Sequence, residues 1–199
     1  MPVDQLGLPC DIDAIGILAR RYGLRVLDDA ACAFGSRNNC RPVGALADVT
    51  VFSLHARKVI TTGEGGMITT CDAALAERLR RLRAQGMSLS DYARHAGPPT
   101  RFENYPEVGY NYRITDIQAA IGLVQLDRLD DILERRRAVA ARYGAHLSGH
   151  PAFIAPHVPD GLIHNWQSYQ IRLREGSRLC RNASASLAIW RPAGCRAGC

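Results

Sequence analysis

The protein has 199 residues, of which 47% are hydrophobic and 22% are charged, and its formal net charge is +6 at pH 7. This length and composition predict a globular chain that can bury one core. No segment is long and apolar enough to span a bilayer, and residues 1–9 lack the basic and apolar regions of a secretory signal. The sequence therefore predicts a cytoplasmic protein without a membrane partner.

The positive charge comes partly from two arginine clusters, at residues 78–83 and 135–137. Aromatic residues do not alternate with these arginines, as they would in a platform on which bases stack. We therefore expect no nucleic-acid partner. A solvated surface and a surface that attracts a nucleotide-sugar diphosphate are both consistent with these clusters.

The seven cysteines show no disulfide framework, and without a secretory signal their thiols are expected to be reduced. Cys195 and Cys199 lack the second ligand pair that a structural zinc site needs. The sequence therefore predicts no metal site.

Helical and strand patterns alternate in the first third of the chain. Residues 11–22 are apolar at helical spacing and are followed by Gly23, which favours a helix that ends there. Residues 24–28 and 49–54 are apolar runs typical of buried strands. This alternation of strand and helix predicts an α/β fold.

Two adjacent carboxylates, Asp28 and Asp29, end the first of these strands. Side chains alternate between the two faces of a strand, so at most one of the two carboxylates faces a given pocket. A carboxylate at this position can keep a heterocyclic nitrogen protonated. The alternative is an N-cap for a helix that begins at Ala30.

Lys58 lies just past the end of the second strand and precedes a loop with three glycines, residues 61–66. An amine close to apolar surface and to another cation, here Arg57, is suited to attack a carbonyl, which is Schiff-base chemistry. The alternative is a solvated lysine in a turn. A nucleotide-binding phosphate loop is a poor match, because its glycines precede the lysine and a Ser or Thr follows it.

Together, Lys58 and the strand-end carboxylates suit pyridoxal phosphate. This cofactor needs a lysine for covalent attachment and an acid at its pyridine nitrogen.

The second half of the chain begins with a predicted short strand at residues 67–70 and a helix that Asp72 caps and that ends near Gly86. Residues 87–106 form a long loop, for which we expect subunit contacts or a substrate rim. A helical pattern runs from Thr115 or Asp116 to Leu147, which is long for a single helix, with Gln118 and Gln125 as surface or capping groups. Arg113, in the turn before it, is equally suited to bind an anion or to remain solvated.

Three ordered blocks of sequence, residues 28–36, 52–67 and 109–120, resemble the DegT/DnrJ/EryC1/StrS sugar aminotransferases. The resemblance runs from about Leu6 to Leu173. It implies part of the large domain of a type I pyridoxal-phosphate aminotransferase, with a mixed, mainly parallel sheet and flanking helices, over residues 1–150. Residues 151–175 would begin a small C-terminal domain, in which residues 168–173 form the first strand. The tail, residues 176–199, is atypical and is expected to be disordered or frame-shifted.

The resemblance also implies roles for individual residues around a cofactor shared between the two subunits of a homodimer. Lys58 would bond covalently to pyridoxal phosphate, Asp29 would contact its pyridine nitrogen, and Ala31 would lie against the ring. The cofactor's phosphate would be held by Ser53 and by Asn111 of the partner subunit, while His55 and Arg57 would shape the lysine loop.

Cys32 departs from the family pattern, because many relatives have Gln or His at this position, close to the cofactor's 3′ hydroxyl. A thiol is a weaker hydrogen-bonding group than either. Both a small buried residue and a reactive thiol are consistent with a cysteine here.

The implied activity is transfer of an amino group from an amino acid, glutamate, to a nucleotide-linked keto-sugar in sugar or polysaccharide biosynthesis. The resemblance lacks the N-terminal part that supplies further phosphate contacts, so we expect a fragment with weak or no activity alone. The alternative is a non-catalytic remnant that binds pyridoxal phosphate or dimerises and has a regulatory role.

Overall fold

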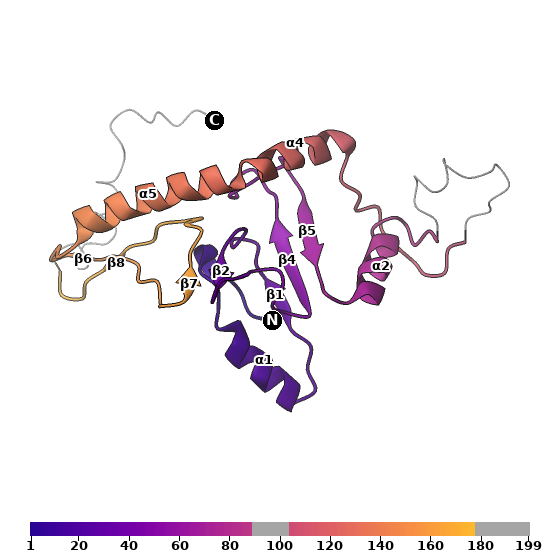
Figure 1. Cartoon of the computed structure of the whole chain (residues 1–199), viewed down its shortest axis with the longest axis horizontal. Helices are drawn as coiled ribbons and strands as arrows, with labels where there is room; N and C mark the ends of the chain where they lie inside the picture. Colours follow the sequence, from indigo (N-terminus) through magenta and orange to yellow (C-terminus); the bar gives the residue numbers. More distant parts are fainter. Residues whose placement is uncertain (89–103, 178–199) are drawn as a thin grey trace.

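The structure is a computed structural model that describes residues 1–88 and 104–177 (Figure 1). Most of the predicted loop at residues 87–106 and nearly all of the predicted atypical tail lie outside the described residues, as do Cys180, Cys195 and Cys199.

The central sheet has the strand order β1-β4-β5, formed by Leu27–Asp29, Val49–Ser53 and Gly66–Thr69. β1 and β4 are parallel, whereas β4 and β5 are antiparallel. The sheet is therefore mixed, as the resemblance implies, but only one of its two described pairings is parallel. β4 consists of β-branched and aromatic residues with a serine at its end, and its side chains alternate between buried and half-buried.

Helix α1, Ile12–Arg21, precedes the sheet and confirms the helix predicted at residues 11–22. Asp11 caps it by accepting a hydrogen bond from Ala14 N at 3.1 Å. Ile12 and Ala19 pack with Val26 in a small buried cluster. β1 begins at Leu27 rather than at the predicted Leu24, because the backbone before it is held by a side chain: Val26 N donates to Asp48 Oδ2 at 2.7 Å.

Helix α2, Ala73–Leu82, begins as predicted after Asp72, whose side chain accepts a hydrogen bond from Leu75 N at 3.0 Å. The helical pattern after residue 115, which is long for a single helix, is divided into two helices. Two helices, α4 at Asp116–Asp127 and α5 at Leu129–Leu147, meet at Arg128, whose ψ of 4° is not helical. A continuous apolar pattern did not reveal this break, since a single residue is enough to redirect the chain.

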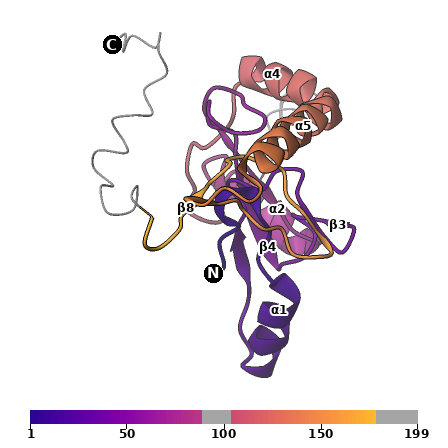
Figure 2. The same ribbon diagram turned by 90° about the vertical axis from the view of Figure 1, so that its left-hand side faces the viewer.

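The remaining elements are short. β2 (Arg37–Asn38) pairs with β3 (Arg41–Pro42) and with β7 (Leu162–Ile163), and β6 (Phe153–Ile154) pairs with β8 (Arg172–Leu173). A 3-10 turn, η1, spans Gln5–Gly7. The strand predicted at residues 168–173 is thus reduced to its last two residues. The division at residue 150 stays a prediction, but β7 joins residues 151–175 to the first part of the chain, and Figure 2 shows the two segments side by side.

Above the C-terminal end of β4, α4 and α5 run along one side of the molecule (Figure 1). Leu133 of α5 packs with Leu54, Val59 and Ile60, which flank Lys58 in the sequence. Within the described ranges 1–88 and 104–177, no helix has both the length and the apolar character that crossing a membrane requires.

Candidate functional site

The candidate site forms where β1 and β4 end. Parallel neighbours end at the same edge of a sheet, so the segments that follow β1 and β4 emerge together. Lys58 Nζ donates a hydrogen bond to Cys32 Sγ at 3.2 Å. This contact therefore brings together two of the three sequence blocks. Its two residues are 26 positions apart in the sequence.

The strand register separates the two adjacent carboxylates. Asp29 is paired with Val51 and Asp28 with Thr50, so Asp29 shares its face of the sheet with Val51 and Ser53, and Asp28 lies on the opposite face. Asp28 is buried and Asp29 is half-buried. Asp29 is thus the carboxylate on the face of Ser53, as its predicted role requires.

Asp29 is held by its own backbone rather than by a helix. Its Oδ1 accepts a hydrogen bond from Ala31 N at 3.1 Å, which is the geometry of a short turn stabilised by an aspartate side chain. The residues that follow form turns, so the alternative of a helix N-cap at this position is wrong. The turn fixes the carboxylate at the sheet edge without using its second oxygen.

Local hydrogen bonds shape the loop that carries Lys58. Lys58 N donates to His55 O at 2.9 Å, and Arg57 N donates to His55 Nδ1 at 3.2 Å. His55 N in turn donates to Ser53 Oγ at 3.3 Å. The loop is anchored by buried apolar residues on both sides, which leaves the half-buried Lys58 side chain to reach Cys32.

Two amide side chains that sequence reasoning missed connect both halves of this site. Asn165 is only 1% exposed, and its Nδ2 donates to Cys32 O at 2.7 Å and to Phe34 O at 3.0 Å. Gln167 Nε2 donates to Arg57 O at 2.7 Å. The only signal in the sequence was a pair of amides flanking Trp166, which does not reveal contacts with residues more than 100 positions away.

Asn111 lies apart from the Lys58 loop. It is exposed, and its backbone forms an isolated bridge with Ala84 beside the C-terminal end of α2. Within the described part of the chain, no hydrogen bond joins its side chain to Lys58, Cys32 or Asp29. Its predicted contact is with the cofactor of a partner subunit, and that role stays a prediction.

Gln118 is confirmed as a capping residue. It completes a capping box with Thr115 at the start of α4. Its Nε2 also donates to Glu64 O at 2.9 Å, which ties α4 to the glycine-containing loop after Lys58.

The residues at this edge fit the chemical needs of pyridoxal phosphate. The cofactor residues predicted within one subunit are Asp29, Ala31, Cys32, Ser53 and Lys58. All five are half-buried, so a ligand can reach them. An amine, a carboxylate and a hydroxyl are the three groups that covalent attachment, the pyridine nitrogen and the phosphate require. Lys58 is also the only lysine among the 25 lysine and arginine residues, and a guanidinium cannot replace its amine in covalent attachment.

A separate cavity of about 460 Å³ lies between α5 and residues 166–169, where Trp166 stacks with Tyr169 at a centroid distance of 5.4 Å. Lys58 and Asp29 do not line this cavity. The candidate site is therefore defined by the contacts at the sheet edge and not by this cavity.

The fold matches solved aminotransferase structures. PseC of Helicobacter pylori, which acts in pseudaminic acid biosynthesis, superposes with a TM-score of 0.84 at 28% identity, over 94% of this chain and 48% of PseC. A structure of DesI with its TDP-sugar product superposes with a TM-score of 0.75 at 34% identity, over 87% of this chain and 41% of DesI. The chain therefore has part of the α/β fold of the sugar aminotransferases.

The model of the DegT/DnrJ/EryC1/StrS aminotransferase family matches residues 1–188, and the chain belongs to this family. GDP-perosamine synthase of Caulobacter vibrioides is 43% identical over 183 residues, which are 92% of this chain and 47% of that enzyme. The chain thus spans about half the length of the curated relatives it matches. Members of the family use pyridoxal phosphate and act on sugars.

Proposed function

We propose that this chain supplies the cofactor-holding part of a pyridoxal-phosphate-dependent aminotransferase. The enzyme would transfer an amino group from an amino acid, glutamate, to a nucleotide-linked keto-sugar in sugar or polysaccharide biosynthesis. The observation that supports this most strongly is the contact between Lys58 Nζ and Cys32 Sγ, because it joins the lysine loop to the turn that carries Asp29.

Each residue has a role that its position supports. Asp29, held by Ala31 N, would keep a proton on the pyridine nitrogen, and Ser53 on the same sheet face would hold the phosphate. When bound, pyridoxal phosphate supplies an electron sink for the carbanion formed at the substrate. Lys58 Nζ would accept the proton from the α-carbon of the donor amino acid and return it after the electrons have moved.

Cys32 would position the amine of Lys58. Its thiol accepts the hydrogen bond from Lys58 Nζ, while its backbone carbonyl is fixed by the buried Asn165. A thiol is a weak acceptor, so it can orient the amine and still release it for proton transfer.

The proposed substrate follows from relatives of this chain. The name of GDP-perosamine synthase and the TDP-sugar bound to DesI both indicate sugars linked to a nucleoside diphosphate. The two arginine clusters noted in the sequence would attract the diphosphate of such a substrate.

A homodimer with shared sites is part of the proposal. α4 buries none of its residues within the described chain and exposes Ile117, Leu123 and Val124, which is an apolar surface typical of a subunit contact. Asn111 precedes this helix and would reach the phosphate of the cofactor of the partner subunit. We expect the 199-residue chain alone to be weakly active or inactive, because Ser53 and one partner residue are few donors for a phosphate dianion.

The test is reduction of the complex with borohydride after incubation with pyridoxal phosphate, followed by peptide mass mapping. Since Lys58 is the only lysine, a modified ε-amine can only be this residue, and the N-terminal amine is resolved as a separate peptide. Lys58→Ala should lose the modification and the visible absorbance of the complex. Arg20→Ala, at an exposed position of α1, keeps the amine and should retain both. Labelling confined to the N-terminus would contradict the proposal.

Addition of glutamate then separates the two candidate functions. Loss of the visible absorbance on addition of glutamate, with formation of a keto acid, supports an aminotransferase half-reaction. A complex that forms at Lys58 and does not respond to glutamate supports the non-catalytic alternative, a cofactor-binding or dimerising protein.

A further inference from the structure

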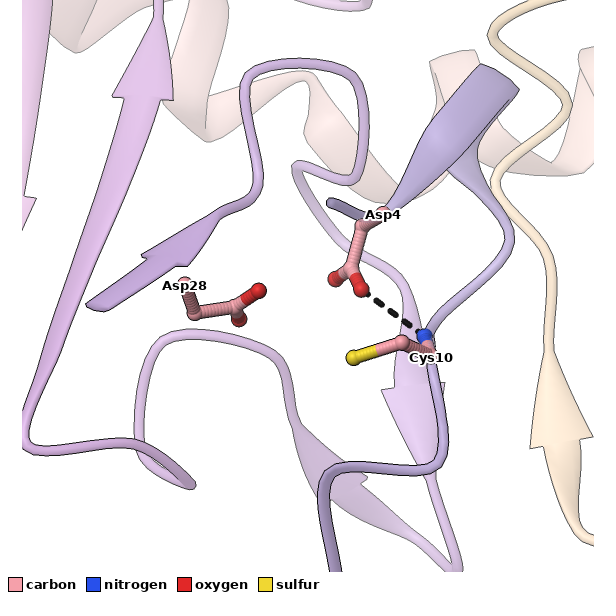
Figure 3. A group of neighbouring side chains, drawn as sticks. All are labelled: Asp4, Cys10 and Asp28. Carbon is pink, nitrogen blue, oxygen red and sulfur yellow. Dashed lines mark hydrogen bonds between the residues drawn. The ribbon is translucent and has the colours of Figure 1, made fainter. Parts of the chain in front are cut away.

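Three side chains that the proposed reaction does not use converge on the opposite face of β1. Asp4 precedes η1, Cys10 precedes α1, and Asp28 belongs to β1 (Figure 3). One carboxylate oxygen of each aspartate and the thiol sulfur all lie within 4.8 Å of one another. Figure 3 shows the Asp28 carboxylate and the Cys10 thiol both directed into the space beside Asp4.

The cluster is buried and carries an unpartnered oxygen. Asp4 and Asp28 are 1% and 3% exposed. Cys10 N donates to Asp4 Oδ1 at 2.8 Å, but Asp28 Oδ1 has no hydrogen-bond partner in the described part of the chain. Thr50, paired with Asp28 on the same sheet face, also has a buried hydroxyl without a partner among these residues. Polar groups that are buried without partners are costly, so a ligand that binds these oxygens would stabilise the cluster.

Two buried carboxylates and a thiol in such close contact suit a positive charge, because the carboxylate oxygens and the sulfur lie within 4.8 Å of one another. Within residues 1–88 and 104–177, none of the three takes part in a salt bridge. A bound cation would compensate both carboxylates at once and would accept the unpartnered oxygen as a ligand.

We propose that Asp4, Cys10 and Asp28 bind one zinc-type divalent cation. Zn²⁺ accepts both thiolate sulfur and carboxylate oxygen, whereas Mg²⁺ and Ca²⁺ prefer sites made of oxygen only. The three side chains would fill three positions of a tetrahedral site, and a water molecule would fill the fourth. Coordination replaces the thiol proton, which is released to solvent.

Such a cation would have a structural role. Asp4 N donates to Asp29 O at 3.0 Å, and Asp29 N donates to Pro2 O at 3.1 Å, so the N-terminal segment already pairs with β1. The cation would lock this segment to β1 from the face opposite Asp29 and Ser53. The proposed cofactor chemistry would remain separate from it.

The test uses the full chain in a background in which Cys180, Cys195 and Cys199 are changed to Ser, so that these thiols cannot bind metal. After treatment with a chelator, zinc is titrated by calorimetry and cobalt by absorbance. We expect one equivalent of zinc, and with cobalt a near-ultraviolet band from thiolate-to-metal charge transfer. Cys10→Ser should lose this band, and Asp28→Asn should keep it while weakening affinity by about tenfold or more.

Matched controls are Cys71→Ser and Asp130→Asn, which change an exposed cysteine and an exposed aspartate away from the cluster and should leave binding unchanged. A measurement that needs no variant is alkylation: zinc should slow labelling of Cys10 but not of Cys71. Absence of zinc binding, a cobalt band that survives in Cys10→Ser, or equal affinity in Asp28→Asn would each overturn the proposal.

Discussion

Asn165 shows how one buried side chain can hold a site together without taking part in its chemistry. Its Nδ2 donates to the carbonyls of Cys32 and Phe34, and its Oδ1 accepts from Gln167 N at 2.8 Å. The turn that presents Cys32 to Lys58 is therefore fixed by a residue 133 positions further along the chain.

We predict that Asn165→Ala lowers the free energy of unfolding by about 2–3 kcal/mol, because it leaves two buried carbonyls and one amide N–H without their partner. The affinity for pyridoxal phosphate should fall as well, since the Cys32 turn loses its anchor. Urea unfolding and an absorbance titration measure the two effects. Asn104→Ala, at an exposed position, is the control and should change the stability by less than about 0.5 kcal/mol. An Asn165→Ala variant as stable as the control would contradict this account.

The charged side chain of Asp48 holds the backbone of Val26, the residue before β1. Its carboxylate accepts hydrogen bonds from Val26 N and from Arg25 Nη1, at 2.7 and 2.8 Å. These bonds, first that of Val26 N, lower the pKa of Asp48 below the usual aspartate value. A carboxyl whose folded pKa is depressed stabilises the fold above its unfolded pKa, and this stabilisation is lost as pH falls through the folded pKa.

For Asp48→Asn we therefore expect a loss of about 1 kcal/mol in unfolding free energy at neutral pH, typical of one hydrogen bond. The difference from the unchanged protein should begin to shrink as pH falls below about 4, the unfolded aspartate value, and should vanish only below the lower folded pKa, where the carboxyl is protonated in both states. The measurement is urea unfolding of both proteins between acidic and neutral pH. A difference that stays constant across this range would show that the charge of Asp48 is not involved.

At the scale of elements, the lysine loop depends on a helix from the second half of the chain. Leu133 of α5 is 4% exposed and packs on Leu54, Val59 and Ile60. Gly35, whose φ is 83°, lies against the same leucine, and a Cβ there would come within 2.7 Å of Leu133 Cδ1. α5 thus supports both of the segments that meet at Lys58.

Leu133→Ala should destabilise the protein by about 2–5 kcal/mol, as expected for a large-to-small change in a core. We also expect weaker binding of pyridoxal phosphate, because the cavity that the substitution creates would lie directly beneath the loop of Lys58. Thermal unfolding and cofactor titration measure both. Val139→Ala on the same helix, at a position that is 40% exposed, is the comparison and should have a smaller effect on each.

At the scale of the whole molecule, the exposed apolar face of α4 predicts self-association. Leu123 is 66% exposed, and Ile117 and Val124 are exposed on the same short helix. A monomer that keeps this surface in water gains nothing from it, whereas a second copy would bury it.

Leu123→Glu should therefore weaken the homodimer by at least about tenfold, since it places a charge in an apolar contact. Sedimentation velocity over a range of protein concentrations measures the change. Ala138→Glu adds the same charge at an exposed position of α5 and should leave the association unchanged. If the unchanged protein is monomeric at all concentrations, the homodimer and the role of Asn111 are both wrong.

The sequence by itself determined the local parts of this protein. It located the strand that delivers Lys58, the carboxylate pair whose faces alternate, the helix cap at Asp72, and the helix starts near Asp11 and Thr115. These features are readable because each depends on neighbours within a few residues, such as strand alternation or a side chain that caps its own helix. The family blocks added the functional class for the same reason, since each is a contiguous segment.

The tertiary structure decided what depends on distant residues. Three features have no local pattern in the sequence. They are the break at Arg128, the hydrogen bonds from Asn165 and Gln167 to the candidate site, and the cluster of Asp4, Cys10 and Asp28. The spacing of Cys195 and Cys199 predicts no metal site, whereas the three proposed ligands come from separate segments of the chain. Parallel pairing of β1 with β4 and packing of α5 set such distances, and a one-dimensional pattern carries no information about them.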